Sequence, residues 1–135
     1  MKYEIEVLVR FGETDALGHV NNASYFIYLE EARVRFFQEL GYPMDMNEWN
    51  FILASTKCDF LDQAYFSQEL KVTTTVSHIG TKSFTLSHDI VDAKTENVIA
   101  RGTATVVYFD FKEQKSAAIP ETLRSQLEVF GSLVK

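Results

Sequence analysis

The chain has 135 residues, of which 46% are hydrophobic, and this is enough for one globular domain with its own apolar core. Its formal net charge is −6 and it has no run of lysine or arginine, which argues against a nucleic-acid binder. The single cysteine excludes an intramolecular disulfide and a cysteine-based zinc site. Because no stretch resembles a signal peptide or a membrane span, we expect a cytoplasmic protein with no membrane partner.

The first predicted element is a strand at the N-terminus. Apolar side chains alternate there with charged ones, which is the period of a strand with one buried face: Tyr3, Ile5, Val7, Val9 and Phe11. The alternation ends in residues 12–18, which begin and end with glycine. A loop therefore follows this strand.

A long helix is predicted over residues 22–40. Apolar residues recur there at three- and four-residue spacing and cover more than half of the helix circumference: Tyr25, Phe26, Ile27, Leu29, Ala32, Phe36, Phe37 and Leu40. Asn21 or Asn22 can cap the start, and Gly41 followed by Pro43 ends the pattern. We therefore expect other parts of the structure to surround this helix.

The rest of the chain is predicted to be mainly strands. They cover residues 51–61, 70–79, 83–91 and 98–111, with residues 80–82 as a hairpin turn and residues 121–130 as a short helix that begins after Pro120. Ala100, Gly102 and Ala104 form a row of small residues that lets a sheet approach a helix closely. The order indicates a single α+β domain over residues 1–135, with an antiparallel sheet wrapped around one helix.

The loop between the first strand and the helix carries the polar side chains best suited to chemistry. Glu13, Asp15 and His19 come just before a helix N-terminus, where unpaired backbone N–H groups and the positive end of the helix dipole are available. A carbonyl oxygen placed there would be polarised while a nearby carboxylate attacks its carbon. The arrangement suits acyl transfer.

The same loop also carries a recognisable motif. The run TDALGHVNNASY over residues 14–25 continues as LEEAR over residues 29–33, and weaker features are KSF at 82–84 and IPE at 119–121. With these motifs the sequence resembles the 4-hydroxybenzoyl-CoA thioesterase-type branch of the hot-dog acyl-CoA thioesterases over nearly its whole length. The resemblance implies a hot-dog fold, in which a five-stranded antiparallel sheet wraps a long central helix. It also implies a homodimer with one continuous sheet and active sites at the interface, assembling into a homotetramer.

The resemblance implies hydrolysis of an acyl-CoA substrate, with no cofactor and no metal. Asp15 matches the catalytic carboxylate, which acts either as a nucleophile that forms a mixed anhydride or as a general base toward water. Asn22 matches the helix-start position whose backbone N–H binds the thioester carbonyl. The substrate-binding positions matched are Gly18, His19, Tyr25, Lys82 and Ser83, of which the last two lie in a region that contacts the CoA nucleotide in relatives.

Several of these residues also have a purely structural interpretation. Asp15 can cap a turn or the helix, and Glu13 can pair with a nearby arginine rather than act in catalysis. His19 can hydrogen-bond the loop backbone rather than assist Asp15, and Lys82 can be an ordinary hairpin residue. The aromatic stripe of the helix belongs first to the core, with at most one or two members lining an acyl channel.

Other polar residues are expected to be structural. His78 and His88 fall in register with apolar strand residues, which favours sheet-face or interface histidines with satisfied hydrogen bonds over metal ligands. Cys58 is expected to be a small buried hydrophobe with no activating neighbour. Glu30 and Arg33 are expected to form a structural pair at three-residue spacing.

Two other functions compete with thioester hydrolysis. A non-catalytic acyl-CoA binding module would keep the fold without turnover, although the presence of Asp15 argues against it. An acyl-thioester hydratase or dehydratase would pair an aspartate with a histidine, so His19 would have to approach the substrate.

Overall fold

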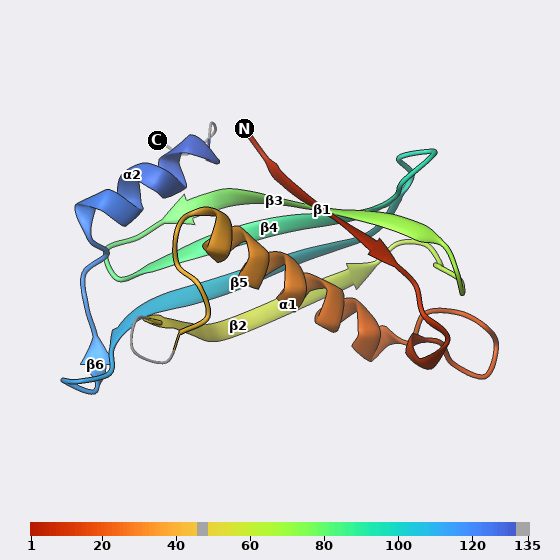
Figure 1. The fold of residues 1–135 in the computed structure, drawn as a ribbon, viewed down its shortest axis with the longest axis horizontal. Coiled ribbons are helices and arrows are strands. Elements are labelled where there is room, and N and C mark those ends of the chain that lie inside the picture. Colours follow the sequence, from red (N-terminus) through yellow and green to blue (C-terminus); the bar gives the residue numbers. More distant parts are fainter. Residues whose placement is uncertain (46–48, 132–135) are drawn as a thin grey trace.

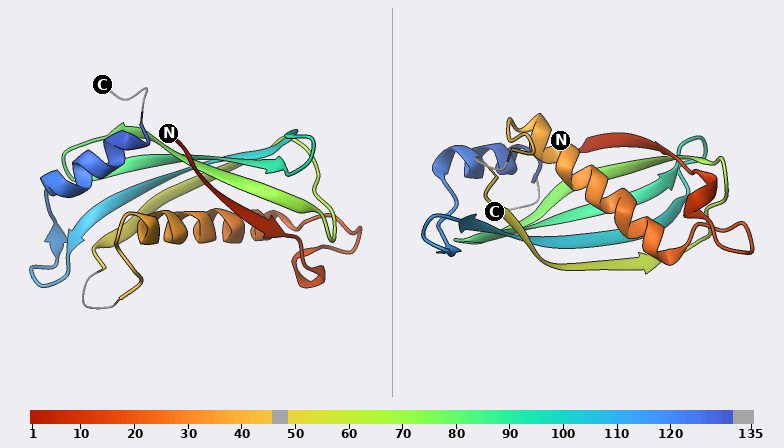
Figure 2. Two further views of the ribbon diagram at one scale, coloured as in Figure 1. Left: turned by 45° about the horizontal axis from the view of Figure 1, so that its top comes forward. Right: turned by 60° about the horizontal axis from the view of Figure 1, so that its bottom comes forward.

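A five-stranded antiparallel sheet arches over one long helix in the computed structural model, which describes residues 1–45 and 49–131 (Figures 1 and 2). The elements in chain order are β1 (Tyr3–Leu8), η1 (Phe11–Glu13), α1 (Asn22–Glu39), β2 (Phe51–Phe60), β3 (Glu69–Ile79), β4 (Ser83–Asp92), β5 (Val98–Asp110), β6 (Lys115–Ser116) and α2 (Glu121–Val129). The strand order is β1-β3-β4-β5-β2, and β6 pairs with the end of β5. The predicted α+β architecture and each predicted element are confirmed, whereas η1 and β6 were not predicted.

The strands of the sheet alternate between a buried and a more open face, as their sequences predict. On β3 and β4 the buried positions are Leu70, Val72, Thr74, Val76, Phe84, Leu86, His88 and Ile90. Phe11, predicted to continue the first strand, lies instead in η1 and is 75% exposed. The alternation therefore fixes which face of the sheet meets the helix.

The helix α1 lies against the buried face of the sheet with one of its own sides. That side includes Tyr25, Leu29, Ala32 and Phe36, each at most 2% exposed. The opposite side faces away from the sheet in Figure 2, and Ile27 on it is 53% exposed. The helix is thus not surrounded within the chain, contrary to the expectation from its wide apolar stripe.

The small residues of β5 allow the close approach that the sequence predicts. A Cβ atom on Gly102 would lie 2.6 Å from Cδ1 of Leu29 and 3.2 Å from the carbonyl oxygen of Lys57. Because Leu29 is 1% exposed, its side chain has little room to give way. Glycine is therefore required here by the distance between helix and sheet.

The strand β2 forms one edge of the sheet and runs antiparallel to α1. Its last residue, Phe60, packs against Tyr25 in the first turn of the helix, with ring centroids 5.3 Å apart. Its first residue, Phe51, stacks on Phe37 near the end of the helix at 4.2 Å. Residues 53–57 of this strand are all exposed, so its outer edge is open.

Candidate active site

The loop before α1 forms a tight turn with Asp15 at its base. Thr14 and Val20 form an isolated antiparallel bridge, and the backbone N–H of Asp15 donates to the carbonyl oxygen of His19 at 2.7 Å. Gly18 closes the turn with a φ of +82°, which glycine adopts without steric cost. This backbone conformation, rather than a side-chain contact, accounts for glycine at position 18.

The carboxylate of Asp15 is held by one of its two oxygens. Oδ1 accepts hydrogen bonds from the backbone N–H groups of Leu17 at 2.9 Å and His19 at 3.1 Å. Oδ2 has no hydrogen-bond partner among the described residues, and the side chain is exposed. Asp15 therefore forms the predicted turn and still presents one carboxylate oxygen to the outside.

The start of α1 leaves one backbone donor free. Asn21 is the N-cap: its Oδ1 accepts from the N–H of Ala23 at 2.9 Å, and its carbonyl oxygen accepts from the N–H of Ser24 at 2.8 Å. Asn22 is the first helical residue rather than the cap. No acceptor for the Asn22 N–H lies among the described residues, as is typical of the first turn of a helix.

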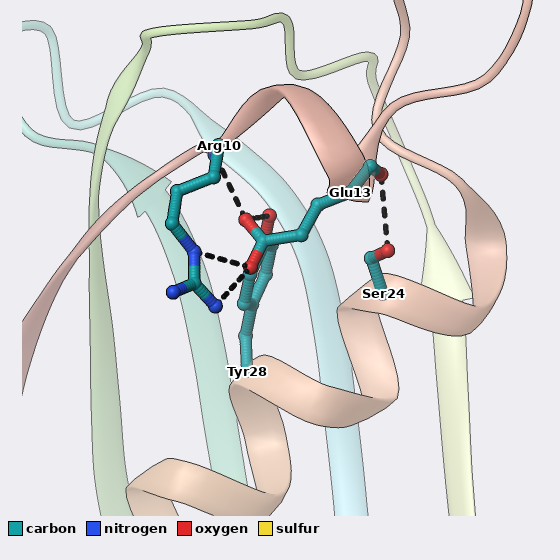
Figure 3. Close-up of polar contacts among 4 residues, drawn as sticks. All are labelled: Arg10, Glu13, Ser24 and Tyr28. Carbon is teal, nitrogen blue, oxygen red and sulfur yellow. Dashed lines mark hydrogen bonds and ion pairs between the residues drawn. The ribbon is translucent and has the colours of Figure 1, made fainter.

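Glu13 fixes the loop against the helix (Figure 3). Its carboxylate accepts from the N–H of Arg10 at 2.9 Å, from Nη2 of the same arginine at 2.9 Å and from the hydroxyl of Tyr28 at 2.8 Å. Its carbonyl oxygen accepts from Oγ of Ser24 at 3.0 Å. The prediction that Glu13 pairs with an arginine is thus confirmed.

The surroundings of Glu13 also shift two pKa values. Burial raises the pKa of Glu13, but the hydrogen bonds from Arg10 and Tyr28 outweigh it, so the net pKa lies below the usual range. Burial, together with the bond to Glu13, raises the pKa of the Tyr28 hydroxyl. Tyr28 therefore remains a donor and Glu13 an acceptor at neutral pH.

His19 and Tyr25 contact a neighbouring loop that the sequence did not connect with them. The ring of His19 packs edge-on against Tyr65 at 5.1 Å, while its backbone forms the bonds to Asp15 described above. Tyr25 is 2% exposed, and its hydroxyl accepts from the N–H of Ala64 at 3.2 Å. Tyr25 is therefore a core residue beneath the start of the helix.

Lys82 and Ser83 lie at the opposite end of the molecule from Asp15. Lys82 lies in the β3–β4 turn beside α2 and Ser83 begins β4, whereas the loop before α1 lies near the start of β3 (Figure 1). The 11 residues of β3 span about 36 Å at ~3.3 Å per residue. The fold of a single chain therefore does not bring these two residues to Asp15.

The two strand histidines differ from each other. Nδ1 of His88 lies 3.0 Å from Oγ1 of Thr74, but its buried Nε2 has no partner among the described residues. His78 is exposed because a register shift follows Val76. The expectation of satisfied hydrogen bonds is therefore only half met at His88.

Two further expectations have different outcomes. Burial raises the pKa of the Cys58 thiol to about 11, so it is not activated, as predicted. Glu30 and Arg33 form no ion pair within 4.0 Å among the described residues, and Glu31 pairs with Arg35 at 2.9 Å instead. The sequence does contain an indication that Arg33 is buried: it lies four residues from both Leu29 and Phe37, on the buried side of the helix.

Large apolar side chains are exposed around the Asp15 turn. They come from the turn itself, from the end of β2 and from the loop that follows: Phe11, Leu17, Phe60, Leu61, Tyr65 and Phe66, each between 43% and 78% exposed. Such a concentration marks a binding or interaction surface. In the described part of the chain, no three or more His, Cys, Asp or Glu side chains gather as metal ligands, and no helix is long and apolar enough to cross a membrane.

Comparisons with known proteins agree with this architecture. The chain is 31% identical to the long-chain acyl-CoA thioesterase FadM of Escherichia coli over 127 residues, which cover 93% of this chain and 96% of that protein. It is 39% identical to the uncharacterised protein YsmA of Bacillus subtilis over 83 residues, covering 62% of this chain and 56% of that protein.

Solved structures show the same fold. A predicted thioesterase from Bacillus stearothermophilus superposes with a TM-score of 0.90 at 25% identity, covering 97% of both chains. A thioesterase from Thermus thermophilus, solved with coenzyme A and zinc, has a TM-score of 0.83 at 28% identity, covering 96% of this chain and 93% of that one. Residues 9–127 match the sequence profile of the thioesterase-like superfamily, and the chain belongs to this family of thioester hydrolases, which includes acyl-CoA thioesterases.

Proposed function

We propose that this protein hydrolyses an acyl-CoA thioester to a free carboxylic acid and CoA, with Asp15 as the reacting carboxylate and the backbone N–H of Asn22 as the donor to the thioester carbonyl. Either Oδ2 of Asp15 attacks the carbonyl carbon, the C–S bond breaks and water hydrolyses the resulting anhydride, or Asp15 takes a proton from water as the water attacks. Both routes consume one water and release the thiol.

The observation that carries the proposal is the pair of free groups at the start of α1. Two backbone N–H groups hold Oδ1 of Asp15 and leave Oδ2 without a partner, and the N–H of Asn22 has no acceptor among the described residues. The Glu13 cluster ties this turn to the helix through Ser24 and Tyr28. The oxygen that attacks and the N–H that donates to the thioester carbonyl thus lie on one segment that is fixed by hydrogen bonds.

Known magnitudes are sufficient for this chemistry without a metal. One backbone donor to a developing oxyanion contributes about 3–4 kcal/mol to transition-state stabilisation. Fixed proximity of the carboxylate to a bound thioester contributes up to about 7–11 kcal/mol more. A thiolate is already a good leaving group, so a strong general acid is not required.

The exposed edge of β2 supports a homodimer in the proposal. Long unprotected edge strands are rare in monomers because they pair with other chains, and residues 53–57 are open on this edge. Two β2 strands that pair antiparallel about a two-fold axis would extend the sheet across both subunits. Asp15 lies on an exposed turn, and a partner subunit would cover it and shield it from bulk solvent. Further pairing of dimers into a homotetramer belongs to the same proposal.

The two-fold axis would also give Lys82 and Ser83 a role. Antiparallel pairing places the hairpin end of one subunit toward the Asp15 end of the other, because these lie at opposite ends of the protomer. We therefore place Lys82 and Ser83 as contacts to the CoA nucleotide of the partner's site, with Gly18, His19 and Tyr25 near the acyl end.

The test is a free-thiol assay over short-, medium- and long-chain acyl-CoAs together with benzoyl and phenylacetyl types. We expect thiol release with at least one member and a product with the mass of the free acid. Tight binding of CoA esters without thiol release from any of them would contradict hydrolysis and would favour the binding module. A product with the mass of a hydrated or dehydrated thioester would favour the other enzyme class.

A further inference from the structure

The buried side of α1 contains an arginine without a partner. Arg33 is only 8% exposed, although arginine is rarely buried without a paired acid or hydrogen-bond acceptor. Among the described residues it has no hydrogen bond and no carboxylate within 4.0 Å. Glu30, one turn away, acts on it through charge alone. None of its nitrogen atoms is among the fully buried side-chain atoms without a partner, so the guanidinium lies under the surface with its donors directed to an accessible space.

Arg33 lines a pocket between α1 and the β2 edge of the sheet. The pocket has a volume of about 330 Å³, and its walls include Val34, Phe37, Phe51, Leu53 and Val106. Glu30 lines the pocket together with Arg33, and the other walls are apolar or aromatic. A pocket with an apolar body and a few polar groups is the usual form of a small-molecule subsite.

No group beneath Arg33 acts as its counter-ion. Burial and, to a smaller extent, the positive charge of Arg33 lower the pKa of His88 to about 4. His88 is therefore neutral at physiological pH, and Thr74 beside it is uncharged as well. The guanidinium donors are therefore available to an acceptor oxygen that enters from the pocket side.

The dimer proposed above would place this pocket beside the other subunit's reacting groups. Within one protomer Arg33 lies 11 residues beyond Asn22, which is about 16 Å along the helix. The pocket adjoins Phe51 and Leu53 at the start of β2, whereas Phe60 at its end packs against the helix start. Antiparallel pairing of two β2 strands brings the start of one beside the end of the other, and hence the pocket beside Asp15 of the partner subunit.

We propose that this pocket receives the distal end of the acyl group bound at the partner's helix start, and that Arg33 selects acyl groups that carry an acceptor oxygen remote from the thioester. The shared chemistry is an oxygen acceptor on an apolar acyl body, supplied either by a second carboxylate or by a ring hydroxyl. A guanidinium binds a carboxylate through two parallel hydrogen bonds and a hydroxyl through one. The inference rests on the proposed hydrolysis and deepens it.

The experiment compares kcat/KM for matched pairs of substrates. One pair is phenylacetyl-CoA and 4-hydroxyphenylacetyl-CoA, and the other is hexanoyl-CoA and adipoyl-CoA, which adds a second carboxylate. For at least one pair we expect the wild type to prefer the oxygen-bearing member by about ten- to hundredfold, the range for a hydrogen bond to a charged group. The pair that shows the preference identifies the source of the oxygen.

Arg33→Met keeps the length of the side chain and removes its donors. In this variant the ratio of kcat/KM between the two members of a pair should fall close to one, while the member without the oxygen is still hydrolysed. Arg33→Lys keeps the charge but loses the planar fork, so it should retain only part of a carboxylate preference. Arg35→Met, on the exposed side of the same helix, is the matched control and should leave the preference unchanged.

Mixed dimers test the origin of the subsite. A dimer of one Asp15→Asn chain and one Arg33→Met chain contains one site with both residues intact only if they come from different subunits. Such a dimer should recover the wild-type preference, and a mixed dimer without the preference would overturn the arrangement across subunits. If the wild type hydrolyses acyl-CoAs without preference, or if Arg33→Met keeps the preference, the role of Arg33 is wrong while hydrolysis stands. If no acyl-CoA is hydrolysed, the proposed function itself fails.

Discussion

Two neighbouring asparagines divide the work at the start of α1. Asn21 accepts the hydrogen bond that caps the helix, and Asn22 contributes a free backbone N–H. The sequence motif marks both positions but does not say which residue caps. Only the backbone angles decide: Asn21 is extended, with φ −65° and ψ 140°, and helical geometry begins one residue later.

Because Asn21 and not Asn22 caps the helix, the role of the Asn22 N–H as donor to the thioester carbonyl can be tested without disturbing the helix. Asn22→Pro removes the backbone N–H at the first helical position, where proline is well tolerated, and the extended Asn21 suits a following proline. We expect kcat for thiol release to fall about 10²- to 10³-fold with little change in melting temperature. Asn22→Ala keeps the N–H and should remain active. Equal activity of the two variants would show that this N–H does not bind the carbonyl.

His88 makes stability depend on pH in a defined direction. Its pKa is about 4 in the folded protein, mainly through burial, against 6.5 as its ordinary value. The unfolded chain therefore takes up a proton as the pH falls below 6.5 while the folded protein stays neutral. The contribution of His88 to the free energy of unfolding is fully present above pH 6.5, and about 3 kcal/mol of it is lost as the pH approaches 4.

Urea unfolding at pH 7.5 and pH 4.5, at one protein concentration, measures this loss. His88→Gln cannot titrate and should lose less stability between the two pH values than the wild type. An identical loss in both proteins would assign the pH dependence to other groups.

Among the elements, β2 has the greatest influence on the proposed site. It pairs with β5 on one side only, its end supports the helix start, and its beginning lines the Arg33 pocket. Dimer formation and activity are therefore expected to depend together on this strand.

Ser55→Lys places a charge in the open part of β2 and, in a dimer, two like charges near each other. We expect sedimentation to show monomers and thiol release to be lost. Thr103→Lys, at an exposed position of the neighbouring β5, adds the same charge away from the edge and should leave the dimer intact. A fully active Ser55→Lys monomer would contradict an active site shared between subunits.

For the whole molecule, local sequence patterns correctly predicted the strands, the long helix and the loop that carries Asp15. The alternation in β1 and the row of small residues around Gly102 could be interpreted without tertiary information, because period and residue size indicate which face is buried. Tertiary features were harder. A register shift turned His78 outward, and the distance of Lys82 from Asp15 follows from strand length and order, which no single motif contains. Arg33 was expected to form a structural pair with Glu30, because three-residue spacing on a helix favours such a pair.

The most direct measurement is thiol release by Asp15→Asn beside the wild type on the best substrate. Asparagine keeps an Oδ1 that can accept from Leu17 and His19, so the turn should persist while the carboxylate is lost. We expect release to fall by at least about 10³-fold, with melting temperature and CoA-ester binding close to those of the wild type. Asp89→Asn, at a half-buried carboxylate paired with Arg101, should retain full activity. Turnover by Asp15→Asn close to that of the wild type would contradict Asp15 as the reacting group.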